Sequence, residues 1–213
     1  LSALPAGILV GGLFCGIPVV PLIVQSIPVL LLAVLLILGL SHFPEKMIRG
    51  FSIFATVIRA AGTIGITLGA FSYMTGVSLL PRMTSLDEAL KTVSSIGIVL
   101  LGSLPFAEIL QRVLKQPLQW LGDKMGLDEA STAGFLVGIV NALPVVSDMK
   151  HMSEKGIILN AAFLVCTTAA VSAHLGFVLG VDAPATGALL AAKFAGGIAS
   201  LFLAFLFVRR MEA

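Results

Sequence analysis

Long apolar runs separated by short clusters of charged residues dominate this chain. A helix needs about 20 apolar residues to cross the hydrocarbon core of a bilayer, and most of the runs reach that length. The predicted membrane-spanning helices cover residues 4–24, 27–40, 51–73, 85–104, 156–179 and 185–208. The pattern therefore predicts an all-α, polytopic membrane protein with about six transmembrane helices in one domain over residues 1–213.

Short polar links and prolines place the boundaries of several predicted helices. The uncharged pair Gln25–Ser26 predicts a tight hairpin between the first two helices. Pro44 stands at a favourable first helical position before the third run. Ser85 and Glu88 form a capping-box pattern that begins the fourth helix, and Pro105 is expected to end it near residue 104.

The stretch from Asp128 to Phe177 is apolar enough for a membrane but carries polar groups where lipid would penalise them. Within it, Pro144 follows Asn141 and interrupts any helix there, because proline removes a backbone donor and crowds the preceding turn. The part before the interruption is about 14 residues, or roughly 21 Å of helix, and is too short to cross a core of roughly 30 Å. Residues 128–150 are therefore predicted to form a re-entrant, broken helical hairpin, followed by the full span 156–179.

Charged residues between the runs agree with this layout. Residues 106–127 mix apolar and charged side chains and include Trp120, which predicts an interfacial amphipathic segment. If 128–150 returns to the side from which it entered, one side of the membrane holds Lys46, Arg49, Arg112, Lys115, Lys124, Lys150, Lys155, Arg209 and Arg210. Arg82 then lies opposite. The positive-inside rule places the basic side, and with it both ends of the chain, in the cytoplasm.

The composition excludes an ordinary soluble domain. The 213 residues are 58% hydrophobic and 11% charged, with a mean hydropathy of +1.08, whereas about 25% of residues in soluble domains are charged. No nucleic-acid partner is inferred from the net charge of +2, because in a membrane chain the placement of Lys and Arg matters more than their sum. Cys15 and Cys166 lie in apolar runs and are interpreted as small helix residues. The start at Leu1, without Met, leads us to expect a piece of a longer chain.

Several separated motifs follow one another over nearly the whole chain. They are Phe43-Pro44-Glu45-Lys46-Met47-Ile48-Arg49-Gly50-Phe51, Asn141-Ala142-Leu143-Pro144, Met149-Lys150-His151-Met152, Asn160-Ala161-Ala162-Phe163, His174-Leu175-Gly176-Phe177, and Lys193 followed by Gly196-Gly197. In order and spacing they resemble the ethanolamine permease family of bacterial ethanolamine-utilisation systems. Members of that family are much longer, so the resemblance implies the C-terminal half of a transporter.

The resemblance implies a carrier that moves ethanolamine into the cytoplasm, as a multi-pass protein of the bacterial inner membrane. Its partners would be ethanolamine, the lipid bilayer, and either the missing N-terminal half or further copies of the chain. It implies no enzymatic reaction and no cofactor. Family members can carry a second Asn where this chain has Ala142 and an acidic residue where it has Ala173.

Protonated ethanolamine needs acceptors for its ammonium and a partner for its hydroxyl. Asn141 can supply an amide oxygen at the interruption, and its alternative role is to brace that interruption. Asp148 could compensate the cation, although its charged neighbours also fit a solvated loop. Asn160 and His174 are fourteen residues apart on the predicted helix 156–179, about four turns, and so share one face. These four are the predicted substrate-binding residues.

Pathway or gating roles are predicted for Pro144, Lys193 and Arg59. Lys193 lies inside the last predicted span, where a charge costs roughly 2.5–3.5 kcal/mol unless it is paired or wet, so we expect it to pair across the bundle. A lysine repels an ammonium, which favours helix docking or gating over contact with substrate. Arg59 is expected to face the same pathway or to pair with Glu108. His174 could instead bridge helices; no His or Cys partner stands at the spacing of a metal site.

Three other functions stay open on the sequence alone. The first is transport of another small polar solute, since a broken helix is common to many transporters. The second is a half that does not transport and only packs against a partner half. The third is an intramembrane enzyme, against which the chain has neither a G-x-S-x-G nor an H-E-x-x-H motif.

Overall fold

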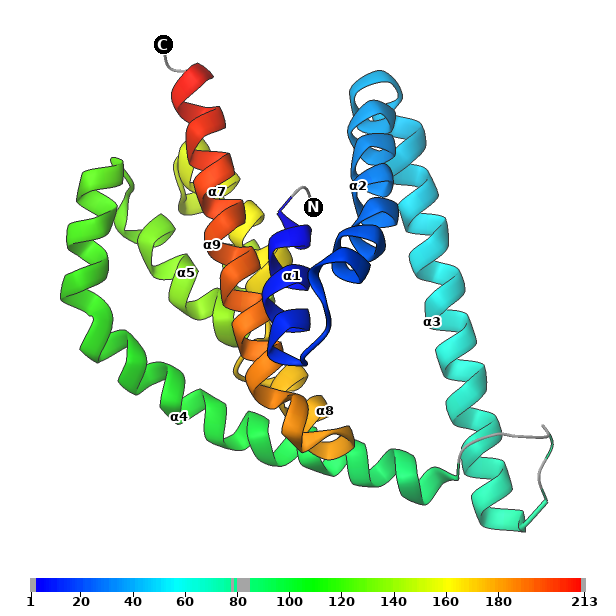
Figure 1. Ribbon diagram of the computed structural model, residues 1–213. Coiled ribbons are helices and arrows are strands. Elements are labelled where there is room, and N and C mark those ends of the chain that lie inside the picture. Colours follow the sequence, from blue (N-terminus) through cyan, green and yellow to red (C-terminus); the bar gives the residue numbers. More distant parts are fainter. Residues whose placement is uncertain (1–2, 78, 80–84, 212–213) are drawn as a thin grey trace. The chain divides into compact units, whose positions relative to one another are not determined.

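The structure is a computed structural model that describes residues 3–77, 79 and 85–211 (Figure 1). Arg82 lies outside this part. The described residues form helices and no strand, which confirms the all-α class. The α-helices are α1 (Leu4–Phe14), α2 (Val19–His42), α3 (Pro44–Thr75), α4 (Leu86–Met125), α5 (Glu129–Val140), α6 (Ala142–Asp148), α7 (Glu154–Thr167), α8 (Ala173–Val181) and α9 (Thr186–Met211), with the short 3₁₀ helices η1 (Met149–His151) and η2 (Ala183–Ala185). The chain forms two compact units, unit 1 of residues 1–30 and 94–213 and unit 2 of residues 31–93.

Unit 2 contains the end of α2, all of α3 and the start of α4. Pro44 is the first residue of α3, as predicted, and Gly76 ends this helix in the left-handed conformation with a φ of 72°. The turn from α2 into α3 is tight, because the Phe43 N–H donates to the Gly39 carbonyl at 2.8 Å and a Cβ on Gly39 would lie 2.9 Å from the Met47 sulfur. At 32 residues, or roughly 48 Å, α3 is long enough to cross a bilayer with tilt.

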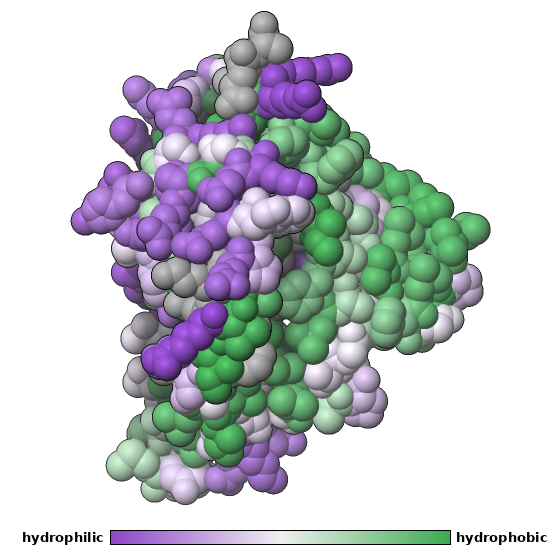
Figure 2. Space-filling model, turned by 90° about the vertical axis from the view of Figure 1, so that its left-hand side faces the viewer, coloured by the Kyte–Doolittle hydropathy of each residue, from purple (hydrophilic) through white to green (hydrophobic). Residues whose placement is uncertain are grey.

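Large apolar side chains cover much of the surface. Ile37 on α2 is 62% exposed, and Ile66 and Met74 on α3 are 72% and 83% exposed. Figure 2 shows apolar residues, in green, over a large part of the face in view. Soluble proteins rarely expose contiguous apolar surface of this extent, so these helices are suited to lipid or to a protein partner.

Three helical segments are long and apolar enough to cross a membrane: Val19–His42, Pro44–Thr75 and Ala183–Arg210. This finding concerns the described part of the chain and rests on length and composition. The apolar helices Leu4–Phe14 and Glu129–Val140 are shorter. The predicted count of about six spans is therefore not confirmed, while the last span, predicted at 185–208, coincides with α9 (Thr186–Met211).

The predicted hairpin at Gln25–Ser26 is wrong, because α2 continues through this pair and through Pro28. The turn comes earlier, where α1 ends at Phe14 and Gly16 adopts a φ of 72°. There the Gly16 N–H donates to Leu13 O and the Ile17 N–H donates to Gly12 O. This pair of bonds is the Schellman motif, in which a glycine ends the helix. A positive φ suits glycine, whereas an uncharged Gln–Ser pair gives a helix no reason to stop.

The fourth helix begins as predicted and ends later than predicted. The Glu88 N–H donates to the Ser85 hydroxyl at 3.4 Å, which places Ser85 as the cap. The helix then continues through Pro105 and Pro117 to Met125, so the expected end near residue 104 is wrong, and residues 106–127 form mostly the second half of this helix. Within unit 1, α4 follows a curved path in Figure 1. A mid-helix proline costs a backbone hydrogen bond and favours bending, but it does not always end the helix.

Unit 1 is built around α9, which packs against α1 and α7, while α7 also packs against α5 (Figure 1). Small residues allow these close approaches. A Cβ on Gly7 of α1 would lie 2.7 Å from the Ala192 carbonyl oxygen, and one on Gly176 of α8 would lie 2.6 Å from the Cα of Ile96 in α4. Close packing of this kind is how helices associate where lipid removes the hydrophobic driving force.

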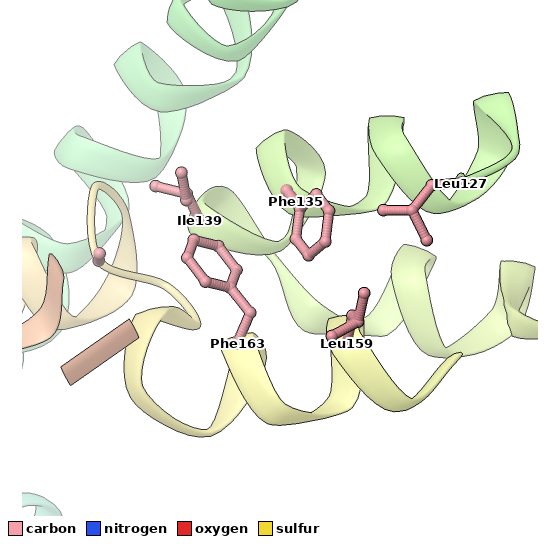
Figure 3. Packing of buried hydrophobic residues seen from close by; sticks show 6 residues of the cluster. Leu127, Phe135, Ile139, Leu159 and Phe163 are labelled. Carbon is pink, nitrogen blue, oxygen red and sulfur yellow. The ribbon is translucent and has the colours of Figure 1, made fainter. Parts of the chain in front are cut away.

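The core of unit 1 lies between α5 and α7 (Figure 3). Phe135 of α5 and Phe163 of α7 pack edge to face, with ring centroids 5.4 Å apart and an interplanar angle of 86°. Leu127, Ile139, Leu159 and Ala170 complete the buried cluster. Edge-to-face aromatic pairs contribute about 0.5–1.5 kcal/mol beyond the burial of their surface, so this contact fixes α5 against α7.

Candidate functional site

The first interruption lies at Asn141, between α5 and α6. Asn141 is extended, with φ −154° and ψ 127°, and its side-chain oxygen accepts the Leu143 N–H at 3.0 Å, which caps α6. Pro144 lies in the first turn of α6, where backbone N–H groups have no acceptor within the helix, so the N–H that proline lacks is not missed by the helix. The predicted interruption is thus confirmed, and it falls at Asn141, ahead of the proline.

A second interruption divides the predicted span 156–179, which is therefore wrong as a single helix. The first part, α7, ends at Thr167, and α8 begins at Ala173. Between them Ala169 adopts a φ of 54°, and the N–H groups of Ser172 and His174 both donate to the Ala169 carbonyl. Left-handed backbone at alanine is unusual and persists only where the surroundings enforce it.

Two hydrogen bonds join these interruptions. The Val171 N–H donates to the Ile139 carbonyl at 3.3 Å, and the Ser172 hydroxyl donates to the Val140 carbonyl at 2.5 Å. Both acceptors belong to the last turn of α5, whose carbonyls have no partners within their own helix. The second interruption therefore satisfies the end of the first, as irregular backbone at membrane depth requires.

The carbonyl oxygen of Thr168 lies within hydrogen-bond distance of two side chains, those of His174 and Lys193. His174 Nδ1 lies 2.9 Å from this oxygen, and Lys193 Nζ lies 3.0 Å from it and 3.2 Å from the Cys166 carbonyl. Because a carbonyl only accepts, Nδ1 of His174 carries a proton and donates it to this oxygen. Lys193 thus pairs across the bundle with backbone at the end of α7.

Asn160 takes up a different position. It is fully buried, and its Nδ2 donates to the carbonyls of Ser131 at 2.8 Å and Gly156 at 3.0 Å. Its Oδ1 has no hydrogen-bond partner in the described structure and lies 2.4 Å from where a Cβ on Gly134 would stand. Asn160 therefore ties α7 to α5. The shared helix face predicted for Asn160 and His174 is wrong, because the helix is interrupted between them.

Asp128 fixes the N-terminal ends of α5 and α7. Its carboxylate caps α5 by accepting from the Ser131 N–H at 2.7 Å and from the Ser131 hydroxyl at 2.5 Å, and it accepts from the Ser153 N–H at 2.9 Å. Ser153 in turn caps α7, since its hydroxyl accepts from Gly156 N at 3.2 Å. Burial tends to raise the pKa of Asp128, but the hydrogen bonds from Ser131 and Ser153 outweigh it and lower the pKa well below its usual range.

Asp148 and Pro144 border an open cavity of about 410 Å³. Asp148 pairs with His151, whose Nδ1 lies 2.6 Å from the carboxylate, and both side chains are at least half exposed. The rest of the cavity lining consists of Gly134, Val137, Val145, Ser147, Lys150, His151 and Met152. The predicted residues of this region thus lie in a solvent-accessible hollow, whereas Lys193 borders another cavity.

That other cavity has a volume of about 560 Å³ and lies among α1, α7, α8 and α9. Lys193, Cys166 and several small residues line it, including Gly7, Gly11 and Gly196. Arg59 belongs to unit 2, where it is exposed on α3, and Glu108 pairs with Arg112 one turn away at 2.5 Å. Within the described residues no group of three or more His, Cys, Asp or Glu side chains is placed to hold a metal ion.

Sequence reasoning missed Ser172, Thr168 and Asp128. The signal was present in part: Thr167, Thr168 and Ser172 are clustered polar residues inside an apolar run, and Asp128 precedes Ser131 at cap spacing. At Ser172 and Thr168 the acceptors are backbone carbonyls, which no sequence pattern distinguishes.

The family model "Ethanolamine utilisation protein, EutH" matches residues 1–207. The chain belongs to the EutH family. It is 32% identical over 99% of its length to the "Probable ethanolamine permease EutH" of Listeria monocytogenes, and 30% identical over 100% to the protein of that name in Salmonella typhimurium. A Bacillus subtilis relative, "Uncharacterized protein YxeR", is 31% identical over 93% of the chain. The recognition made from the motifs is thereby confirmed.

The chain spans about half the length of these relatives, 57% of the Listeria protein, 54% of the Bacillus protein and 58% of the Salmonella protein. No solved structure matches the chain. Together with the apolar helices, EutH membership indicates a membrane protein.

Proposed function

We propose that the chain forms part of a carrier that moves ethanolamine across the bacterial inner membrane into the cytoplasm. One observation carries the proposal: two interrupted helices meet through the bond from Ser172 to the Val140 carbonyl. Interrupted helices of this kind expose backbone carbonyls and N–H groups to a polar solute at membrane depth. The printed name of three relatives, "Probable ethanolamine permease EutH", supports ethanolamine as the solute.

The chemistry of the interruptions suits this solute. Ethanolamine carries a primary ammonium with three donors and a hydroxyl that both donates and accepts. The C-terminal ends of α5 and α7 lie at the interruptions, where the partial negative charge of a helix C-terminus favours a cation, and the end of α7 presents the carbonyls of Cys166 and Thr168. Asn141 and His174 supply an amide and an imidazole close to these ends. Asn160 and Pro144 support the site by holding α5, α6 and α7 in place.

Asp148 has the role of attracting the cation. It borders the open cavity beside Pro144, on the side of the predicted hairpin that we place in the cytoplasm. A carboxylate there would draw an ammonium leaving the interruptions. For Arg59, an exposed residue of α3, the pathway role stays a prediction.

In the membrane arrangement that we propose, α5 and α6 form the re-entrant hairpin and α7 with α8 crosses as one interrupted span. If α7 and α8 count as one span, the chain has about six spans, and this even number places both of its ends in the cytoplasm. Residues 106–127 would then lie at the interface, with the exposed Trp120 among lipid headgroups.

Uptake of radiolabelled ethanolamine tests the function. Cells that lack their own permease would express either the chain alone or a complete family protein carrying this half. We expect saturable uptake at acidic external pH, where the cation dominates, and competition by unlabelled ethanolamine in excess of that by glycerol. Equal competition by glycerol, or no saturable uptake by a well-inserted complete protein, would contradict the proposal.

The experiment also distinguishes a second function, suggested by the chain spanning about half the length of its relatives. If only the complete protein transports, the chain is a half that packs with a partner half. Uptake by the chain alone would instead require that copies of it complete the pathway.

A further inference from the structure

We propose that the carbonyls of Cys166 and Thr168 form a binding site for a primary ammonium, and that Lys193 occupies this site as a tethered ligand. We further infer that the ammonium of the substrate enters by displacing Lys193, a step that rests on the proposed function. The observation behind both statements is the pair of contacts from Lys193 Nζ, 3.2 Å to Cys166 O and 3.0 Å to Thr168 O.

The interruption after α7 creates the two acceptors. In a continuous helix the Cys166 carbonyl would accept from residue 170 and the Thr168 carbonyl from residue 172. The Ala170 N–H donates instead to Thr167, and the Ser172 N–H donates to Ala169. The carbonyls of Cys166 and Thr168 are thereby free to face a ligand, and unpaired carbonyls in a water-poor setting require one.

Backbone carbonyls suit a ligand that must leave again. A buried carboxylate would hold an ammonium strongly, and separating that pair would be costly. Both contacts of Lys193 Nζ in the structure are carbonyls, which are dipoles without net charge. The long flexible side chain of lysine can withdraw its ammonium while its stem stays packed.

The chemical match is to a primary alkylammonium. Lys193 presents a CH₂–NH₃⁺ group, and protonated ethanolamine presents the same group with a hydroxyl two carbons away. His174 shares the Thr168 carbonyl through Nδ1, so its Nε2 is a second polar atom next to the site and can hydrogen-bond that hydroxyl. The cavity of about 560 Å³ that Lys193 and Cys166 line gives a small molecule room to approach.

Removing the tethered ammonium tests the site. We expect Lys193→Ala, in the purified full chain, to lose thermal stability and to regain it with millimolar ethylammonium chloride. Tetramethylammonium at the same concentration should have no such effect, because it has the charge but no N–H donors. Lys150→Ala, which removes an exposed lysine of the hairpin, is the matched control and should not respond to ethylammonium.

Displacement makes a second prediction, measured as the Kd for ethanolamine. A group held on a short tether competes at an effective concentration of millimolar order. Lys193→Met, which keeps an apolar stem and removes the charge, should therefore bind ethanolamine about tenfold more tightly than wild type. Unchanged or weaker binding would overturn displacement.

The two proposals fail in different ways. Stabilisation by ethylammonium alone supports the ammonium site even if ethanolamine is never transported, a result that would overturn the proposed function only. The ammonium site would be overturned if ethylammonium stabilised neither Lys193→Ala nor Lys193→Met, or if tetramethylammonium stabilised them equally. Neither result would contradict the proposal of ethanolamine uptake. If Lys193→Ala does not fold, the same two salts are applied to Lys193→Met.

Discussion

The hydroxyl of Ser172 donates a hydrogen bond of 2.5 Å to the backbone carbonyl of Val140, which lies 32 residues earlier in the chain. Val140 is the last residue of α5 and Ser172 immediately precedes α8. Both residues are buried. One side chain thus couples two helix interruptions, so a change at Ser172 affects both.

Ser172→Ala should destabilise the protein by about 1–3 kcal/mol, because it leaves a buried carbonyl without its hydroxyl donor. The midpoint of thermal unfolding in detergent measures this loss, and ethanolamine uptake should fall with it. Ser26→Ala is the matched control, since the buried Ser26 hydroxyl donates one turn back to the Leu22 carbonyl within α2. If both variants melt alike, the bond does not couple the interruptions.

Asn141→Ala should remove the cap of α6 at a cost of about 0.5–2 kcal/mol and weaken ethanolamine uptake. Losing a polar partner of the substrate would lower affinity by about five- to 150-fold. The defect should be larger at low pH, because the neutral amine crosses lipid unaided while the cation needs a carrier.

Two substitutions at Asn141 separate its roles. Asn141→Ser keeps a capping oxygen but loses the amide, so it should restore stability without restoring uptake. Asn141→Asp keeps acceptors and adds a compensating charge, and should be milder than alanine. Wild-type uptake by a well-inserted Asn141→Ala variant at acid pH would leave Asn141 as a structural brace.

Asp128→Asn should lower stability and flatten its dependence on pH. The pKa of Asp128 is lowered in the folded protein, so the carboxylate stabilises the fold fully above the usual pKa of about 3.9, and this contribution is lost progressively as the pH falls from that value toward the lowered pKa. Unfolding midpoints from about pH 5 down to about pH 2 measure the effect. Glu129→Gln, at the exposed neighbouring carboxylate, should keep the slope of the wild type.

A cysteine at Lys150 should react with a membrane-impermeant maleimide only from the cytoplasmic side, because the hairpin of α5 and α6 is expected to return. Lys150 is exposed, and unlike Ser153 it caps no helix. The background would carry Cys15→Ser, since Cys15 is exposed and Cys166 is buried. Val77→Cys, in the link between α3 and α4, should react from outside, because this link is expected on the opposite side of the membrane. Labelling of Lys150→Cys from outside would show that the segment crosses the membrane.

Local rules in the sequence determined the features that a few neighbouring residues decide. The apolar runs determined the helical class, Ser85 with Glu88 determined where α4 begins, and Asn141 with Pro144 determined that a helix stops there. Each rests on a cap, a missing N–H or a run of apolar side chains, and none needs a distant partner.

The tertiary structure decided what depends on groups far apart in the chain. The interruption at Ala169 follows no local signal of comparable strength, and it is held by contacts from Ser172 to α5 and from Lys193 to the end of α7. The buried role of Asn160 likewise depends on the Ser131 carbonyl, 29 residues away. Every residue carries a backbone carbonyl, so the sequence does not show whether a carbonyl freed by an interruption faces water, lipid or a lysine. Only the folded chain shows which partner satisfies it.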